Sequence, residues 1–224
     1  MGRLAVMLGS NALGPEGEAL LAAAAERNVA VMQRHRGETY TLPHEINHAV
    51  NLRALLDQDC DRVLAIGSVG SLSTQLPVGS LLCPDDFIAL HLGLSALDDA
   101  GAHRAPGFDP GWRRQVLRAW KGGGQELRDG GVYWQAIGPR FETPAEIGLM
   151  AAHADVVGMT IASECIVAGE LGLAYAAVCV VDNLANGIGA GELSVAGLEA
   201  ARAANARRLR DGLEAALPRL EAPG

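Results

Sequence analysis

Short apolar runs alternate along this chain with longer segments in which apolar residues recur every three or four positions. The short runs predict buried strands, and the longer segments predict helices that pack one face against a core. The predicted strands are residues 4–8, 29–33, 62–66, 79–83, 132–136, 155–157 and 174–181. The predicted helices are residues 17–26, 43–58, 111–121, 145–153, 163–170 and 194–217. This alternation of strands and helices favours an α/β fold.

The longest predicted helix, residues 194–217, carries an apolar stripe that includes Leu198 and Leu209. Arg202 and Asn205 interrupt that stripe. We expect the helix to pack its apolar face against the sheet. Residues 92–108 and 122–124 fit neither pattern and are predicted to be surface loops, the first long enough to be functional.

Composition limits the classes of protein that this chain can be. Its 224 residues fit one domain, so residues 1–224 are predicted to form a single unit. With 18 Lys and Arg against 26 Asp and Glu, the formal net charge is −8, which disfavours a nucleic-acid partner. The four cysteines lack metal-binding spacing, so we expect reduced, buried thiols. No apolar stretch reaches about 18 residues, so we expect a soluble, cytoplasmic protein without a membrane partner.

Three predicted strands end in residues that suit a phosphate ion. Ser10 follows the first strand, and Arg34 and His35 follow the second. Ser68 lies in a glycine-rich stretch after the third, where backbone amides could form an anion-binding nest. Open α/β sheets bind ligands at the C-terminal ends of their strands, and arginine can pair with phosphate through two N–H groups. Each motif alone also fits an ordinary turn, but the three together favour an anion site.

Polar residues near two later strand ends are further candidates. Met159 and Thr160 precede a predicted helix, where a core methionine and a helix-capping threonine are the ordinary alternatives. Asp182 and Asn183 end the most apolar strand. An asparagine amide offers both a donor and an acceptor to a polar heterocycle, although turns also favour this residue.

Residues 44–48 match the HExxH pattern of zinc hydrolases. Pro43 places His44 in the first turn of the predicted helix, and no later segment offers an obvious third ligand. We therefore expect no metal here, and favour a role at a helix start or at the edge of a substrate site.

Together these motifs resemble the purine nucleoside phosphorylase and 5′-methylthioadenosine phosphorylase family. The most specific match is Gly-Pro-Arg-Phe-Glu-Thr-Pro-Ala-Glu-Ile at residues 138–147. The less specific matches occur in the family order at residues 9–10, 34–35, 42–47 with 51, 67–72, 157–160 with 164, and 183–187. The resemblance implies one phosphorylase-like domain with a twisted, mostly parallel central sheet flanked by helices.

The resemblance also implies a role for each matching side chain. The residues implied to bind inorganic phosphate are Ser10, Arg34, His35, Ser68 and Thr160. Those implied to contact the nucleoside are Phe141, Glu142, Met159, Asp182 and Asn183, with Met159 against the ribose. Glu142 and Asn183 are the implied catalytic residues.

The implied reaction is phosphorolysis of a purine nucleoside to free purine and ribose 1-phosphate, a step of purine salvage. Inorganic phosphate is the co-substrate, and neither a metal nor an organic cofactor is implied. Family members form homo-oligomers, trimers or hexamers, in which a neighbour's loop closes each site. Residues 92–108 are the candidate for that loop.

The residue types also bear on which purine is bound. The Glu142 carboxylate can accept a hydrogen bond from the N1–H of a 6-oxopurine, and Asn183 can bond near N7 and the 6-substituent. A 6-oxopurine nucleoside is therefore the expected substrate, with 5′-methylthio-nucleosides as close alternatives. Sliding the alignment by one residue would instead make Asp182 the base contact.

The chain departs from the family pattern at several positions. The stretch at residues 11–33 is shorter than usual, so a hairpin is expected to be missing. Thr39, Ser163 and Asn186 replace residues that are common in relatives. These departures keep two alternatives open, a nucleoside hydrolase and a catalytically impaired protein that binds purines or nucleotides.

Overall fold

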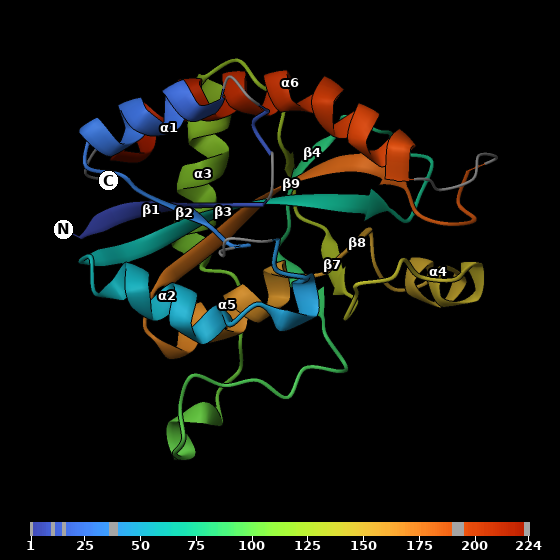
Figure 1. Ribbon diagram of the computed structural model, residues 1–224, viewed down its shortest axis with the longest axis horizontal. Helices are drawn as coiled ribbons and strands as arrows, with labels where there is room; N and C mark the ends of the chain where they lie inside the picture. Colours follow the sequence, from blue (N-terminus) through green and yellow to red (C-terminus); the bar gives the residue numbers. More distant parts are fainter. Residues whose placement is uncertain (1, 10–11, 15–16, 36–39, 190–194, 222–224) are drawn as a thin grey trace.

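The computed structural model describes residues 2–9, 12–14, 17–35, 40–189 and 195–221. Within them, nine strands form one sheet with helices on both faces, which confirms the predicted α/β fold (Figure 1). The strands are β1 (Arg3–Leu8), β2 (Ala30–Gln33), β3 (Cys60–Ser71), β4 (Leu81–Cys83), β5 (Asp86–Ile88), β6 (Arg128–Asp129), β7 (Val132–Gln135), β8 (Val156–Gly158) and β9 (Ala174–Leu184). The helices are α1 (Gly17–Glu26), α2 (His48–Leu56), α3 (Pro110–Gly122), α4 (Pro144–Ala151), α5 (Ile161–Glu170) and α6 (Val195–Glu221), with 3-10 turns η1 (Pro43–Glu45) and η2 (Ala100–Ala102).

The long strands β3 and β9 form the middle of the sheet. The strand order is β5-β7-β8-β3-β9-β4-β6, and β1 pairs with both β2 and β3. The sheet is mostly parallel, as predicted, because only the β3–β8 and β4–β9 pairs are antiparallel. The C-terminal ends of β1, β2, β3 and β9 therefore meet at one edge, where ligands bind in open α/β sheets.

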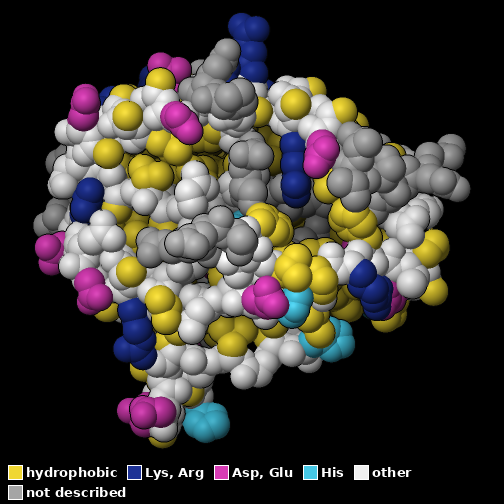
Figure 2. Space-filling model, viewed as in Figure 1, with side chains coloured by type: hydrophobic (Ala, Val, Ile, Leu, Met, Phe, Trp, Pro, Cys, Tyr) yellow, Lys and Arg dark blue, Asp and Glu magenta, His cyan; other side chains and the backbone are white. Residues whose placement is uncertain are grey.

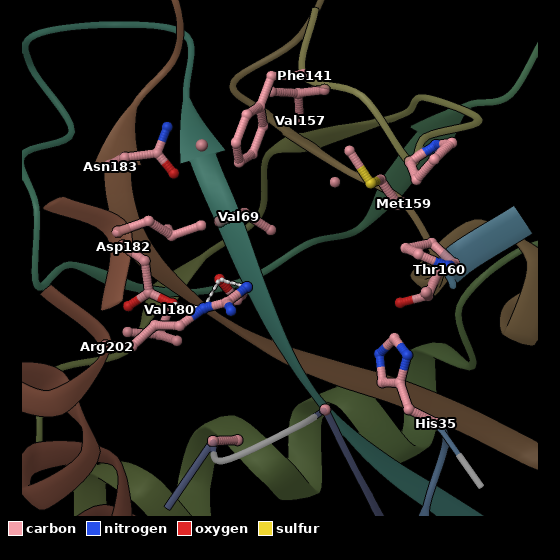
Figure 3. Close-up of a pocket in the computed structure, with 18 of the residues that line it drawn as sticks. His35, Val69, Phe141, Val157, Met159, Thr160, Val180, Asp182, Asn183 and Arg202 are labelled. Carbon is pink, nitrogen blue, oxygen red and sulfur yellow. Dashed lines mark hydrogen bonds and ion pairs between the residues drawn. The ribbon is translucent and has the colours of Figure 1, made fainter. Parts of the chain in front are cut away.

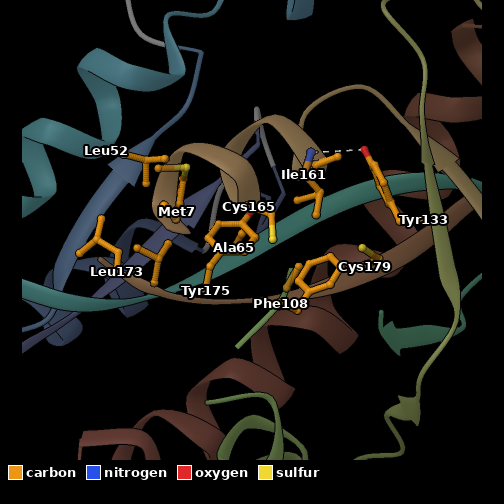
Figure 4. Packing of buried hydrophobic residues seen from close by; sticks show 14 of the residues in the cluster. Met7, Leu52, Ala65, Phe108, Tyr133, Ile161, Cys165, Leu173, Tyr175 and Cys179 are labelled. Carbon is orange, nitrogen blue, oxygen red and sulfur yellow. Dashed lines mark hydrogen bonds between the residues drawn. The ribbon is translucent and has the colours of Figure 1, made fainter. Parts of the chain in front are cut away.

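The core has two main layers, one on each face of the sheet. Successive residues of β1 alternate between them, since Met7 packs on the α2 and α5 side and Leu8 on the side of α1, α3 and α6. Figure 4 shows Met7, Leu52 and Cys165 packed together in the first layer. This alternation explains why an apolar run with no polar positions forms a strand covered on both faces.

The predicted strand at residues 62–66 is too short, and the predicted amide nest after it is wrong. Strand β3 continues to Ser71, with Gly67 opposite Cys179 and Ser68 opposite Val180 in β9. A Cβ atom on Gly67 would lie 3.0 Å from Ile161 Cδ1. The glycine therefore allows α5 to pack closely on the strand, and it does not mark a turn.

The predicted helix at residues 43–58 is two elements, η1 and α2. Asn47 separates them, and its side chain caps α2 by accepting a hydrogen bond from the Val50 N–H at 3.0 Å. The very short strands β5 and β6 were not predicted, because each begins with a charged residue and neither forms a run of apolar positions. Residues 92–108 run as a projecting segment beyond α2 and α5, with only η2 as regular structure (Figure 1).

Candidate functional site

A cavity of about 260 Å³ lies at the edge where β1, β2, β3 and β9 end. Its lining includes every described residue that the sequence analysis assigned to the site, which are Arg34, His35, Ser68, Phe141, Glu142, Met159, Thr160, Asp182 and Asn183. Ser10 and Thr39 lie outside the described residues. Side chains that are up to 149 positions apart in the sequence, Arg34 to Asn183, thus share one pocket.

The pocket has two chemically different ends, with Met159 between them (Figure 3). Asn183 and Phe141 lie at one end, and His35 and Thr160 lie at the other. An aromatic ring and an amide suit a heterocycle, whereas an imidazole and a hydroxyl suit polar oxygens. Phe141 and Asn183, predicted to contact the base, thus lie apart from His35 and Thr160, which are predicted to bind phosphate.

Arg34 is almost fully buried and is held by Glu164. Its Nε and Nη2 donate to the Glu164 carboxylate at 2.6 and 3.1 Å, and its Nη1 donates to the Ile66 carbonyl at 2.7 Å. Tyr175 Oη also donates to Glu164, at 2.6 Å. Burial alone would raise the pKa of Glu164, but the charge and hydrogen bonds of Arg34 hold it below its usual value. Arg34 is thus fixed in place, and its charge is largely balanced before any ligand enters.

His35 is fixed in one tautomer. Its Nδ1 lies 2.7 Å from the Thr41 carbonyl oxygen, and because a carbonyl only accepts, Nδ1 carries the hydrogen. Burial, with the charges of Arg34 and Arg202, lowers the pKa of His35. The ring is therefore neutral near pH 7, which leaves Nε2 as an acceptor.

Thr160 stands at the N-cap of α5, but its side chain makes no capping hydrogen bond. The backbone N–H groups of Thr160 and Ile161 donate instead to Tyr133 Oη, at 3.2 and 3.4 Å. Gly158 makes room for this hydroxyl, since a Cβ there would lie only 2.4 Å from it. The capping alternative for Thr160 is therefore wrong, and its own hydroxyl is left to face the pocket.

Residues 138–146 form one wall of the pocket and are held by local hydrogen bonds. Thr143 and Glu146 make a capping box at the start of α4, and Arg140 donates to both carboxylate oxygens of Glu146 at 2.8 Å. Asn186 donates to the Glu142 backbone carbonyl at 3.1 Å. Burial raises the pKa of the Glu142 carboxyl above its usual value.

Asp182 and Asn183 face different partners. Asp182 is buried and accepts a hydrogen bond from Asn205 Nδ2 at 2.8 Å, with Arg202 Nε 3.6 Å from its other oxygen. Asn183 lies at the Phe141 end, and its Nδ2 donates to the Leu184 carbonyl. The side-chain geometry thus favours Asn183 over Asp182 as the group available to a base.

Arg202 and Asn205 are pocket residues that the sequence analysis did not assign. The signal was present, because both interrupt the apolar face of the last helix. We interpreted them only as imperfections, since a helical pattern does not reveal that its first turns extend over a cavity.

The comparisons with known proteins agree with this geometry. Residues 15–218 match a family model described as the phosphorylase superfamily. The chain belongs to the phosphorylase superfamily. A probable 6-oxopurine nucleoside phosphorylase of Archaeoglobus fulgidus is 43% identical over 162 residues, which cover 72% of this chain and 67% of that protein. A probable S-methyl-5′-thioinosine phosphorylase of Methanosarcina acetivorans is 37% identical over 166 residues, which cover 72% of this chain and 64% of that protein. The aligned part of this superfamily member thus spans about two thirds of each relative.

The fold of this superfamily member also matches a solved structure. A mutant of adenosine/methylthioadenosine phosphorylase from Schistosoma mansoni, in complex with methylthioadenosine, superposes with a TM-score of 0.81 at 18% identity. The match covers 100% of this chain and 93% of that one. The curled, mostly parallel sheet is therefore the phosphorylase fold.

The two histidines of the HExxH string lie in different elements of this superfamily member. His44 is exposed on η1, whereas His48 is buried at the start of α2, so the two do not share a helix face. Within the described ranges, no group of three or more His, Cys, Asp or Glu side chains could hold a metal ion.

The four cysteines are buried, unpaired thiols, as predicted. In the same ranges, no helix is both long and apolar enough to cross a membrane.

Proposed function

We propose that this member of the phosphorylase superfamily cleaves the N-glycosidic bond of a purine nucleoside by phosphorolysis, which releases free purine and ribose 1-phosphate. The observation that carries the proposal is the two-ended pocket, with Phe141 and Asn183 at one end and His35 and Thr160 at the other. A purine at the first end and phosphate at the second leave the ribose between them, against Met159. The names of the two relatives support the same reaction.

The residues would act by orientation and charge stabilisation. Phosphate attacks C1′ of a ribosyl group that gains positive charge, while the purine leaves with the bonding electrons. Ser68, Thr160 and the remaining N–H groups of Arg34 would hold the phosphate. Asn183 and Glu142 would hold the leaving base. This mechanism assigns no step to a metal or an organic cofactor.

We propose a 6-oxopurine nucleoside as the substrate. Ionised Glu142 accepts from N1–H, which 6-oxopurines carry and 6-aminopurines lack. The Archaeoglobus fulgidus relative is named for the same base class, and the Methanosarcina acetivorans relative for a 5′-methylthio sugar. A 5′-methylthioinosine-type nucleoside is thus the alternative within the same base class.

Base release is the direct test. Purified protein is incubated with inosine, guanosine, adenosine, methylthioadenosine or methylthioinosine, each with and without phosphate. The proposal expects release of hypoxanthine from inosine or methylthioinosine only when phosphate is present. Release from adenosine alone would contradict the base assignment, and no release from any of the five would contradict the reaction.

Hydrolysis of the same bond is the second candidate. It is favoured by the ion pair between Arg34 and Glu164. An arginine whose positive charge is already neutralised by a carboxylate attracts a phosphate dianion less strongly than an unpaired arginine does. Equal rates of base release with and without phosphate would identify the hydrolase. A protein that binds these nucleosides without turnover would be the catalytically impaired alternative.

We further propose a cytoplasmic homo-oligomer that acts in purine salvage. The exposed apolar side chains Leu90, Ile137 and Leu149 support an association surface, and the unpaired thiols support a reducing compartment. On the face seen in Figure 2, Lys and Arg side chains are scattered among acidic ones, so this face offers no gathered basic surface for nucleic acid. Light scattering after size exclusion would give the subunit number, and a monomer would contradict the assembly.

A further inference from the structure

Helix α6 places Arg202 in the pocket, where its guanidinium group is held only by long contacts. Arg202 Nε lies 3.6 Å from Asp182 Oδ2, beyond hydrogen-bonding distance, and its Nε and Nη2 each lie 3.4 Å from Ser68 Oγ. The Arg202 side chain remains 38% exposed. Its N–H groups are therefore open to a better acceptor than those it faces now.

Arg34 differs in each of these respects. Its Nε, Nη1 and Nη2 all donate at 2.6–3.1 Å, and its side chain is 2% exposed. Moving Arg34 would leave the Glu164 carboxylate buried without its main partner, which is costly. Among the described lining residues, Arg202 is thus the arginine that can rearrange around a ligand.

Asp182 can release Arg202 without being left unpaired. Asn205 Nδ2 donates to Asp182 Oδ1 at 2.8 Å and to the Val181 carbonyl at 3.1 Å, so the amide holds the carboxylate in place independently. A phosphate oxygen would accept from Arg202 with shorter, charge-assisted hydrogen bonds. Ser68, whose hydroxyl already faces Arg202, would supply a second contact.

We propose that Arg202 binds a phosphate group in this pocket, exchanging Asp182 for the anion. The proposal rests on the function proposed above for the pocket as a whole. The group is either free inorganic phosphate, the co-substrate, or the 5′-phosphate of a purine nucleotide, and both present the same oxygen acceptors. Figure 3 shows Arg202 and Asp182 on one side of the cavity and Thr160 on the other, so an anion between them can accept hydrogen bonds from Arg202 and from the Thr160 hydroxyl.

Calorimetric titration of the full chain tests this without turnover, using inorganic phosphate and inosine 5′-monophosphate as separate probes. The variant is Arg202→Gln, and the matched control is Arg207→Gln. Arg207 lies on the same helix, is 83% exposed and does not line the pocket. Arg202→Gln should weaken binding of one probe roughly 10- to 100-fold, the size expected for a lost charge-assisted bond. Arg207→Gln should bind both probes as the native chain does.

Two further variants separate a binding role from a structural one. Asp182→Asn removes the competing charge, so it should tighten phosphate binding several-fold. Arg202→Lys keeps the charge but loses the planar fork, so its affinity should lie between those of the native chain and Arg202→Gln. A purely structural arginine would produce neither result. Circular dichroism melting of each variant identifies any that fails to fold. The phosphate affinities of the variants that do fold then distinguish a binding role from a structural one.

The probes identify the source of the phosphate group. Weakened binding of inorganic phosphate alone assigns Arg202 to the co-substrate, and weakened binding of the nucleotide alone assigns it to a 5′-phosphate. Unchanged affinity for both probes in Arg202→Gln would overturn the proposal, as would equal weakening in Asp182→Asn. A native chain that binds phosphate but releases no base would contradict the proposed function and leave the assignment of Arg202 intact.

Discussion

At the scale of single residues, the amide of Asn183 is the group that should set base preference. Replacing Asn183 by Asp removes the N–H donor and adds an acceptor, which suits a 6-amino group and repels a 6-oxo group. We expect Asn183→Asp to shift the ratio of kcat/KM for inosine to that for adenosine by about tenfold or more toward adenosine. Asp182→Asn is the matched control and should leave this ratio unchanged. A shift in the control alone would place the base contact at Asp182.

The raised pKa of Glu142 predicts that base preference depends on pH. In the role proposed for Glu142, the carboxylate present above this pKa would accept from the N1–H of a 6-oxopurine, and the carboxylic acid present below it would donate to the bare N1 of a 6-aminopurine. The inosine-to-adenosine ratio of kcat/KM should therefore fall as the pH falls from about 7.5 to about 5. In Glu142→Gln the ratio should be constant across the same range. A ratio that does not change in the native chain would remove Glu142 from base recognition.

At the scale of elements, the start of α5 depends on a close approach between β7 and β8. Gly158→Ala would force Tyr133 Oη away from a Cβ only 2.4 Å distant, and the N–H groups of Thr160 and Ile161 would lose their acceptor. We expect a loss of about 1–3 kcal/mol in the free energy of unfolding, measured in urea, and a higher KM for phosphate. Gly148→Ala in α4, where a Cβ meets nothing within 4 Å, should be neutral or stabilising by up to about 1 kcal/mol. Equal losses in both variants would show that the close approach of Gly158 to Tyr133 is not the cause of the lost stability.

Elements with local signals were predictable, and those that depend on distant contacts were not. The bounds of α1 and the Thr143 cap of α4 follow from residues that are neighbours in the sequence. The length of β3 does not, because Gly67 looks like a turn until α5 is packed against it. Arg202 was missed for the same reason, since its pocket is made by strands far away in the sequence.

At the scale of the whole molecule, a buried histidine should make stability depend on pH. Burial is the main cause that lowers the pKa of His48; the negative charge of Glu164 opposes it, and Arg34 and His35 add to it. In the unfolded chain this histidine takes up a proton near pH 6.5, whereas in the folded chain it does so only at a lower pH. The stabilisation is present above that pH and is lost as the pH falls through it. Urea unfolding at about pH 7.5 and about pH 5.5 should give a smaller loss for His48→Gln than for the native chain. An equal loss in both would show that His48 is not the cause.

In the molecule as a whole, the alternation of apolar and polar positions accounts for the fold. The charged side chains of the site lie in ion pairs, Arg34 with Glu164 and Arg202 with Asp182. Motif resemblance predicted which side chains meet, and every described one lines the cavity. It did not predict that Arg34 is paired with Glu164, because the partner lies on α5, 130 positions away. Because of that pairing, the dependence of base release on phosphate is the property that distinguishes phosphorolysis from hydrolysis at this site.

The most direct measurement is the rate of hypoxanthine release from inosine by the native protein at increasing concentrations of inorganic phosphate. Phosphorolysis predicts a rate that rises from near zero to saturation, with one ribose 1-phosphate formed for each hypoxanthine. Release at a rate independent of phosphate, with free ribose as the product, would contradict it.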